Sequence, residues 1–79
     1  MAENSVKKVL RVIKTLDVGI TSVKVIYDED SDNVVLKYKA DDVNYAYDAM
    51  IDAFYDEDIY EVDCDIDPNK GKGKIYLEV

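Results

Sequence analysis

The chain has 79 residues, and its 18 acidic residues outnumber its 10 lysines and arginines to give a net charge of −8. This length predicts one domain, residues 1–79, with a thin core, and the absence of an apolar run of about 20 residues argues against a membrane span. With no histidine and a single cysteine, the chain lacks the usual general base, the commonest zinc ligand and any internal disulfide. We therefore expect a non-enzymatic protein of the cytoplasm.

The negative charge is concentrated in the middle of the sequence. Residues 28–69 contain fifteen of the eighteen carboxylates and two lysines, a net −13, whereas residues 1–27 sum to +3 and residues 70–79 to +2. Like charges at this density repel one another in a small domain and attract cationic partners. The pattern indicates a protein that binds a positively charged surface, and adaptation to high salt is the alternative origin of the acidity.

The first half of the chain predicts a helix and a β-hairpin. Residues 5–16 are predicted to form an amphipathic helix that Ser5 caps. Its apolar stripe consists of Val6, Val9, Leu10, Ile13 and Leu16, and its opposite face carries Lys7, Lys8, Arg11 and Lys14. Residues 20–27 and 34–40 alternate between apolar and polar side chains, so they are predicted to pair around the acidic turn at 28–33.

The second half repeats this order. A helix is predicted to begin near Asp41 or Asp42, because aspartate favours a helix N-terminus. Its apolar stripe consists of Val43, Ala46, Tyr47, Met50 and Phe54. Residues 59–66 and 74–79 alternate again and are predicted as strands. Their inward side chains are expected to be Tyr60, Val62, Cys64, Ile66, Ile75, Leu77 and Val79. The inward position predicts that Cys64 is a small core residue and not a nucleophile.

The resulting element order is αββαββ, with two similar halves at about 1–40 and 41–79. It predicts an α+β two-layer sandwich, with both helices on one face of a four-stranded antiparallel or mixed sheet. The order resembles a circularly permuted ferredoxin-like fold, in which the first strand is moved to the end. From that resemblance we expect the second and fourth strands to be central and parallel, and both hairpin loops to lie at one end of the sheet. The predicted core consists of Leu10, Ile13, Leu36, Met50, Phe54, Val62 and Leu77.

Both hairpin loops carry oxygen-bearing side chains at alternate positions, a spacing that can converge on a hard cation. These side chains are Asp28, Asp30, Asp32, Asp65, Asp67 and Asn69. Calcium loops of the EF-hand type begin in this way and then require glycine and, at the end, a bidentate glutamate. The first loop has Asn33 and Lys39 at those positions, and the second has Lys70 and Tyr76. We therefore expect plain polar turns and no cofactor, with a calcium site at these six residues as the alternative.

The outer face of the second helix combines carboxylates with tyrosines. It consists of Tyr45, Asp48, Asp52, Tyr55, Asp56, Glu57 and Asp58. Carboxylates spaced along a rigid helix imitate the phosphates of a nucleic acid, and tyrosine supplies the large, rigid contact area that concentrates binding energy. We predict that these seven residues bind a basic protein surface. An ordinary solvated helix face is the alternative.

The face of the sheet turned away from the helices is expected to carry Lys24, Lys37, Lys39 and Lys74 around Tyr76, with Ile26 and Val35 beside them. An aromatic side chain among lysines on a sheet resembles the RNA-binding face of RRM-type domains. The RNP strings of that family are absent, and a net charge of −8 opposes contact with a polyanion. We therefore expect no direct binding of nucleic acid. A homodimer packed sheet to sheet is the alternative use of this face.

In size, charge and lack of catalytic groups, the chain resembles the acidic decoy proteins of phages and mobile genetic elements. Such proteins block CRISPR effectors, restriction enzymes or uracil-DNA glycosylase. The resemblance is one of composition and implies an inhibitor that mimics DNA in the cytoplasm of the host, with anti-CRISPR or anti-restriction activity. The alternatives are a calcium-binding protein that uses the two Asp-rich loops, and a homodimerising structural domain without a ligand.

Overall fold

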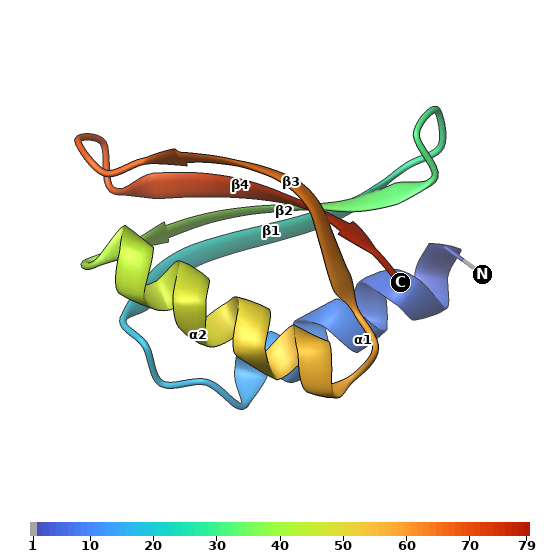
Figure 1. The fold of residues 1–79 in the computed structure, drawn as a ribbon, viewed down its shortest axis with the longest axis horizontal. Coiled ribbons are helices and arrows are strands. Elements are labelled where there is room, and N and C mark those ends of the chain that lie inside the picture. The colour runs from blue at the N-terminus through green and yellow to red at the C-terminus, as the bar shows by residue number, and fades with distance from the viewer. Residues whose placement is uncertain (1) are drawn as a thin grey trace.

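The computed structural model describes residues 2–79, with side chains from residue 5 onward. Its elements are α1 (Ala2–Lys14), β1 (Ile20–Asp28), β2 (Asn33–Ala40), α2 (Val43–Asp56), β3 (Tyr60–Asp67) and β4 (Lys72–Glu78). Both helices cover one face of the four-stranded sheet, and the other face is open (Figure 1). The predicted α+β class, with two helices and an antiparallel sheet, is confirmed. Within residues 2–79, no helix is long and apolar enough to cross a membrane.

The N-terminal helix differs from its prediction at its start. Helix α1 begins at Ala2, so Ser5 lies inside the helix and the prediction that it is the cap is wrong. Alanine and glutamate are strong helix formers, which is why the residues before Ser5 continue the helix. The side chains of Val9, Val12 and Ile13 are buried, whereas Leu10 is half-buried. The stripe that faces the sheet is therefore centred nearer to Val12 than the sequence predicted.

The strands are ordered β1-β2-β4-β3, and every neighbouring pair is antiparallel. Strands β2 and β4 are central, but the expectation that they are parallel is wrong. Helix α2 returns the chain to the end at which β2 began, so β3 runs in the direction of β2 and its hairpin partner β4 runs against it. Val34 therefore pairs with Leu77, and Lys39 pairs with Lys72. As a result, the two hairpin loops lie at opposite ends of the sheet (Figure 1).

The core lies between the helices and the covered face of the sheet. Five of the seven predicted core residues are buried, namely Ile13, Leu36, Met50, Phe54 and Leu77. Ile59, which precedes β3, is 1% exposed and adds a large side chain that the strand pattern did not assign to the core. The face assignments of α2, β2 and β4 are therefore correct.

Strand β3 departs most from its prediction. Its register shifts between Glu61 and Asp63, which marks a β-bulge, and Val62 at the shift is 53% exposed. A bulge inserts one residue, so the simple alternation of faces does not hold across it. Cys64 pairs with the buried Ile75 but is exposed, so its predicted place in the core is wrong. Strand β3 is an edge of the sheet, and its carboxylates discourage pairing with another chain.

Tyr38 joins the sheet to the start of α2. Its ring is buried, and its hydroxyl donates a hydrogen bond of 2.8 Å to the carbonyl of Val43. Burial raises the pKa of Tyr38 to about 12. The ring lies over Gly73, its partner in β4, where a Cβ atom would stand 2.6 Å from Cε1 of Tyr38. Glycine is thus needed at position 73 to admit the tyrosine ring.

Candidate functional site

The seven predicted contact residues form one surface, which we call the acidic face: Tyr45, Asp48, Asp52, Tyr55, Asp56, Glu57 and Asp58. All seven are exposed, with Tyr45 at 61% and Tyr55 at 65%. Helix α2 positions them because its opposite side is held in the core by Val43, Ala46, Met50 and Phe54. Asp42 fixes the start of the helix, since its carboxylate accepts a hydrogen bond of 3.1 Å from the N–H of Tyr45. The predicted N-cap is therefore confirmed.

The C-terminal end of α2 extends the acidic face toward β3. The N–H of Ile59 donates to the carbonyl of Phe54 at 2.9 Å, and the N–H of Asp58 donates to that of Tyr55 at 3.2 Å. This pair of bonds is a Schellman motif, which places its C′ residue in the left-handed region. The C′ residue is Asp58, with φ of 59°, at a position where glycine is usual. The fold therefore holds a carboxylate at the helix end where glycine would be less strained.

Tyr60 joins this surface, although the sequence pattern placed it in the core. Its ring meets that of Tyr55 edge to face, with 5.1 Å between the ring centres, and it is 42% exposed. Its hydroxyl donates to the Asp58 carboxylate at 3.2 Å, and that bond is the first cause of a raised pKa of Tyr60. The turn at Asp58 and the nearby bulge of β3 bring the two rings together. Simple alternation along the strand could not have revealed this contact.

The six predicted metal ligands do not form one site. Asp28, Asp30 and Asp32 lie around the β1–β2 turn, and Asp65, Asp67 and Asn69 lie around the β3–β4 turn at the other end of the sheet. Three of the carboxylates bond to their own turns. Asp28 accepts from the N–H of Asp30 at 3.1 Å, Asp67 accepts from the N–H of Lys70 at 3.2 Å, and Asp32 accepts from the hydroxyl of Tyr27. Within residues 2–79, no cluster of three or more acidic, cysteine or histidine side chains is arranged to hold a metal ion.

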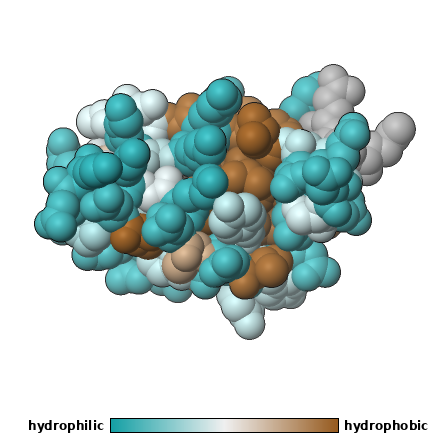
Figure 2. All heavy atoms as spheres, turned by 90° about the horizontal axis from the view of Figure 1, so that it is seen from above, coloured by the Kyte–Doolittle hydropathy of each residue, from teal (hydrophilic) through white to brown (hydrophobic). Residues whose placement is uncertain are grey.

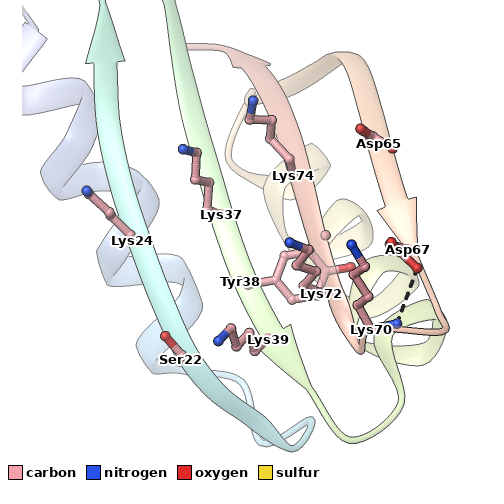
Figure 3. A pocket seen from close by; sticks show the side chains of 11 residues that line it. Ser22, Lys24, Lys37, Tyr38, Lys39, Asp65, Asp67, Lys70, Lys72 and Lys74 are labelled. Carbon is pink, nitrogen blue, oxygen red and sulfur yellow. Dashed lines mark hydrogen bonds between the residues drawn. The ribbon is translucent and has the colours of Figure 1, made fainter.

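The open face of the sheet gathers six cations into a patch, which we call the lysine face: Lys24, Lys37, Lys39, Lys70, Lys72 and Lys74. The sequence pattern identified four of the six. Because β4 begins at Lys72, that side chain points to the same face as Lys74, and the adjacent turn adds Lys70 (Figure 3). The alternate spacing of the last three lysines was the signal that could have found them. Together the six line a hollow of about 500 Å³.

The lysine face adjoins a small apolar area. Pairing across the sheet places Ile26 beside Val35, and Val35 beside Tyr76, in the row next to that of Lys74. Ile26 is 41% exposed, and the Nζ atom of Lys74 lies 5.5 Å from the centre of the Tyr76 ring. Figure 2, which looks onto this face, shows a hydrophobic patch between two hydrophilic areas. The open face thus offers cations and an aromatic side chain in neighbouring rows.

Cys64 is exposed but its thiol is poorly suited to act as a nucleophile. Desolvation is the first cause of a raised pKa of Cys64, and the nearby Glu61 raises it further. Tyr47 donates a hydrogen bond to that carboxylate, and desolvation followed by this bond raises the pKa of Tyr47 as well. The reactive thiolate is therefore disfavoured at neutral pH.

Comparison of the chain with protein-family models, with curated proteins and with solved structures finds no match. The functional interpretation therefore rests on the acidic face and the lysine face themselves, on their geometry and on the chemistry of their side chains.

Proposed function

We propose that the protein is a small acidic inhibitor that works by binding and not by catalysis. In this proposal the acidic face docks in a cationic groove of a protein that handles nucleic acids, as an anti-CRISPR or anti-restriction decoy of a phage or mobile element does. We also infer that it acts in the cytoplasm, and that its element order is a circular permutation of the ferredoxin-like arrangement. The observation that carries the proposal is the exposure of three tyrosines among carboxylates along α2 and at its C-terminal end.

Exposed tyrosines support a protein partner. Tyr45, Tyr55 and Tyr60 are large side chains of low conformational entropy, and such residues dominate the energy of protein interfaces. Burying them in a partner's groove would add apolar contact to the electrostatic attraction. A face that served solubility alone would need the carboxylates and not the aromatic rings.

The absence of lysine and arginine from α2 itself supports the same proposal, with Lys8 and Arg11 of α1 lying in a groove beside Asp56 and Glu57. The sequence from residue 40 to residue 69 contains no lysine or arginine, although it carries eleven carboxylates. Asp48, Asp52 and Asp56 recur about every 6 Å along the axis of α2. Successive phosphates of one DNA strand are roughly 3.4 Å apart along the helix axis, so the carboxylates are spaced at a little less than two phosphate steps. Such a helix attracts a basic groove by long-range steering and competes there with nucleic acid.

Asp58 places a charge at the helix end in the left-handed region, as Asp32 does in the β1–β2 turn. A non-glycine residue in the left-handed region is strained by about 1 kcal/mol, and strained residues that persist gather at binding sites. Replacing Asp58 with glycine should therefore stabilise the fold and weaken binding of the partner. If Asp58 had only a structural role, its replacement would not raise stability while lowering affinity for the partner.

The test uses two variants with equal change in charge. The helix variant, Asp48→Asn/Asp52→Asn/Asp56→Asn, alters the acidic face. The control variant, Glu29→Gln/Asp30→Asn/Asp65→Asn, removes three exposed carboxylates from other parts of the surface. Each immobilised protein captures its target from a nuclease-treated lysate, and association is then measured with the purified target by surface plasmon resonance.

We expect the target to be a nucleic-acid-handling protein that DNA displaces, with association by the helix variant at least about tenfold slower than by the control variant. Tyr55→Ala should instead speed dissociation, as loss of an aromatic anchor does. The proposal fails if the helix and control variants bind equally, or if binding is unchanged between dilute buffer and about 0.5 M salt, where the Debye length falls to a few ångströms.

A further inference from the structure

The lysine face brings like charges close together, so its side chains repel one another. Lys24, Lys37 and Lys74 pair directly across three adjacent strands, and Lys39 pairs with Lys72 in the next row (Figure 3). Neighbouring strands are about 4.8 Å apart, which is well inside the Debye length of about 8 Å at physiological salt. Like charges directly opposite one another destabilise a sheet. A bound anion would relieve this repulsion.

The carboxylates of the protein relieve it only in part. On the edge strand β3, Asp65 pairs with Lys74, Asp67 pairs with Lys72 and Asp63 pairs with Tyr76. Asp28, Glu29 and Asp30 of the β1–β2 turn line a second hollow with Lys37, Lys74 and Tyr76. Lys24, Lys37 and Lys39 have no acidic neighbour across the sheet, since the partner of Lys39 in β1 is Ser22. The cations of β1 and β2 are therefore available to an anion from outside, and Asp65 and Asp67 confine it to the side away from β3.

We infer that the lysine face binds the sugar–phosphate backbone of a single-stranded nucleic acid. Successive phosphates of such a chain are a few ångströms apart, and so are the lysines within one row, which lie on neighbouring β-strands. The hollow of about 500 Å³ over these rows is lined by all six lysines and, on the side of β3, by Asp65 and Asp67. The phosphates would follow the rows of lysines that cross β1, β2 and β4.

The chemistry of the side chains favours phosphate over a protein partner. All six cations are lysines and none is arginine. Protein interfaces are depleted in lysine and enriched in arginine, whereas lysine acts as a point charge toward phosphate and needs no fixed geometry. Contacts of this kind position a backbone without reading its sequence. Binding is therefore expected to depend on charge and little on base sequence.

The row beside the lysines supplies a surface for a base. Tyr76 is half-buried, so its ring is held in place, and Lys74 lies next to it. Bases stack on aromatic side chains in single-strand binding proteins, often beside a cation. A single-stranded nucleic acid whose phosphates follow the lysine rows would place one base over Tyr76 and Ile26. A duplex cannot make this contact, because its bases are already paired and stacked.

The net charge of −8 does not oppose this binding at close range. The acidic face lies on α2, on the far side of the sheet from the lysines (Figure 1). The molecule measures 24 Å along the axis on which the sheet and the helices are stacked (Figure 1), about three times the Debye length at physiological salt. Screening therefore separates the two faces, and the local charge of the lysine face decides the interaction. The expectation that no nucleic acid binds rested on the absence of RNP strings and on the total charge, and the total charge does not describe this face.

The test measures fluorescence anisotropy of a labelled oligothymidylate of about 12 nucleotides, within the site size of small single-strand binding domains. The row variant, Lys24→Gln/Lys37→Gln/Lys74→Gln, removes one row of the lysine face. Its matched control, Lys7→Gln/Arg11→Gln/Lys14→Gln, removes three exposed cations from α1. The two variants have equal net charge, and circular dichroism confirms that both are folded.

Wild type should bind with a slope of log K against log salt of about −2 to −3, as three or four phosphate contacts on a single strand require. The row variant should bind about tenfold more weakly or worse, and with a shallower slope, while the α1 control stays within about twofold of wild type. Tyr76→Leu should weaken binding by about tenfold, which corresponds to 1.4 kcal/mol and to the stacking of one base.

Four results would overturn the inference: no salt-dependent binding by wild type, equal losses in the two lysine variants, a duplex of the same length bound as tightly as the single strand, or polyglutamate bound as tightly as the oligonucleotide. The helix variant of the acidic face should bind the oligonucleotide at least as well as wild type. Failure of this inference is thus distinguishable from failure of the proposed function.

Discussion

The contact between Gly73 and Tyr38 gives the sharpest prediction about the fold. In Gly73→Ala, the new methyl group would stand 2.6 Å from Cε1, 2.7 Å from Cζ and 2.8 Å from the hydroxyl oxygen of Tyr38. These distances are shorter than any relaxed contact, so the ring must move. The ring is buried and its hydroxyl bonds to Val43 at the start of α2. Movement of the ring therefore disturbs both the core and the junction between sheet and helix.

The size of the effect follows from three contributions. Overpacking of a core by one methyl group costs about 1–3 kcal/mol, and loss of the hydrogen bond from Tyr38 to Val43 costs about 1 kcal/mol. Alanine regains about 0.5–1 kcal/mol because glycine is the more flexible residue in the unfolded chain. The free energy of unfolding should thus fall by about 1–3 kcal/mol, which lowers the melting temperature of a domain of this size by roughly 5–20 °C.

Urea denaturation followed by circular dichroism measures this change, and a double-mutant cycle isolates its cause. Tyr38→Leu is destabilising by itself because it removes the ring and its hydrogen bond. If the clash is the cause, adding Gly73→Ala to the Tyr38→Leu background should be neutral or slightly stabilising. Equal losses in the two backgrounds would refute the steric explanation. A Gly73→Ala protein as stable as wild type would show that the ring moves without cost.

Three further predictions concern the helix cap, alkaline pH and calcium. Asp42→Ala should lower the free energy of unfolding by about 1 kcal/mol, measured by urea denaturation, with Asp41→Ala as a control of equal charge. Because the pKa of Tyr38 is raised from 10.0 to about 12, its contribution to stability is complete below pH 10 and lost as the pH rises through 12. Tyr38→Phe should make the fall of the urea midpoint over that range shallower, and Tyr47, whose pKa is also raised, accounts for a remaining fall. Asp30→Asn and Asp67→Asn should act independently on any calcium-specific rise in melting temperature, and synergy would contradict the separated loops.

Helix α2 shows how much the sequence could predict. Its period is regular over the range Val43–Asp56, an aspartate stands at its start, and its buried and exposed sides follow directly. The seven residues of the acidic face could therefore be assigned without a structure. Strand β2 was equally clear, because its inner residues Val34, Leu36 and Tyr38 alternate with Val35, Lys37 and Lys39. Local periodicity fixes which side of an element faces the core.

Relations between elements were harder to predict. The direction of β4 relative to β2 decides where the two acidic loops lie, and no local pattern encodes that direction. The bulge of β3 is a second example, because one extra residue reverses the faces of the strand and exposes Val62. Lys70 and Lys72 were placed in a loop, since nearby glycines mark turns. Pairing with β2 extends β4 to Lys72 and completes the lysine face.

Segregation of charge favours the proposed binding role of the acidity over adaptation to high salt. A surface adapted only to its solvent reduces self-repulsion by interspersing cations among its carboxylates. This protein places six lysines together on the open side of the sheet and the seven residues of the acidic face on the helix side, with Asp65 and Asp67 at the rim of the first cluster and Lys8 and Arg11 at the rim of the second. Each cluster is self-repulsive, so neutralising either one should stabilise the free protein. The two clusters lie on opposite sides of the protein and destabilise it when it is free. This arrangement is explained if each cluster binds a partner of opposite charge. The two partners can then be bound at the same time.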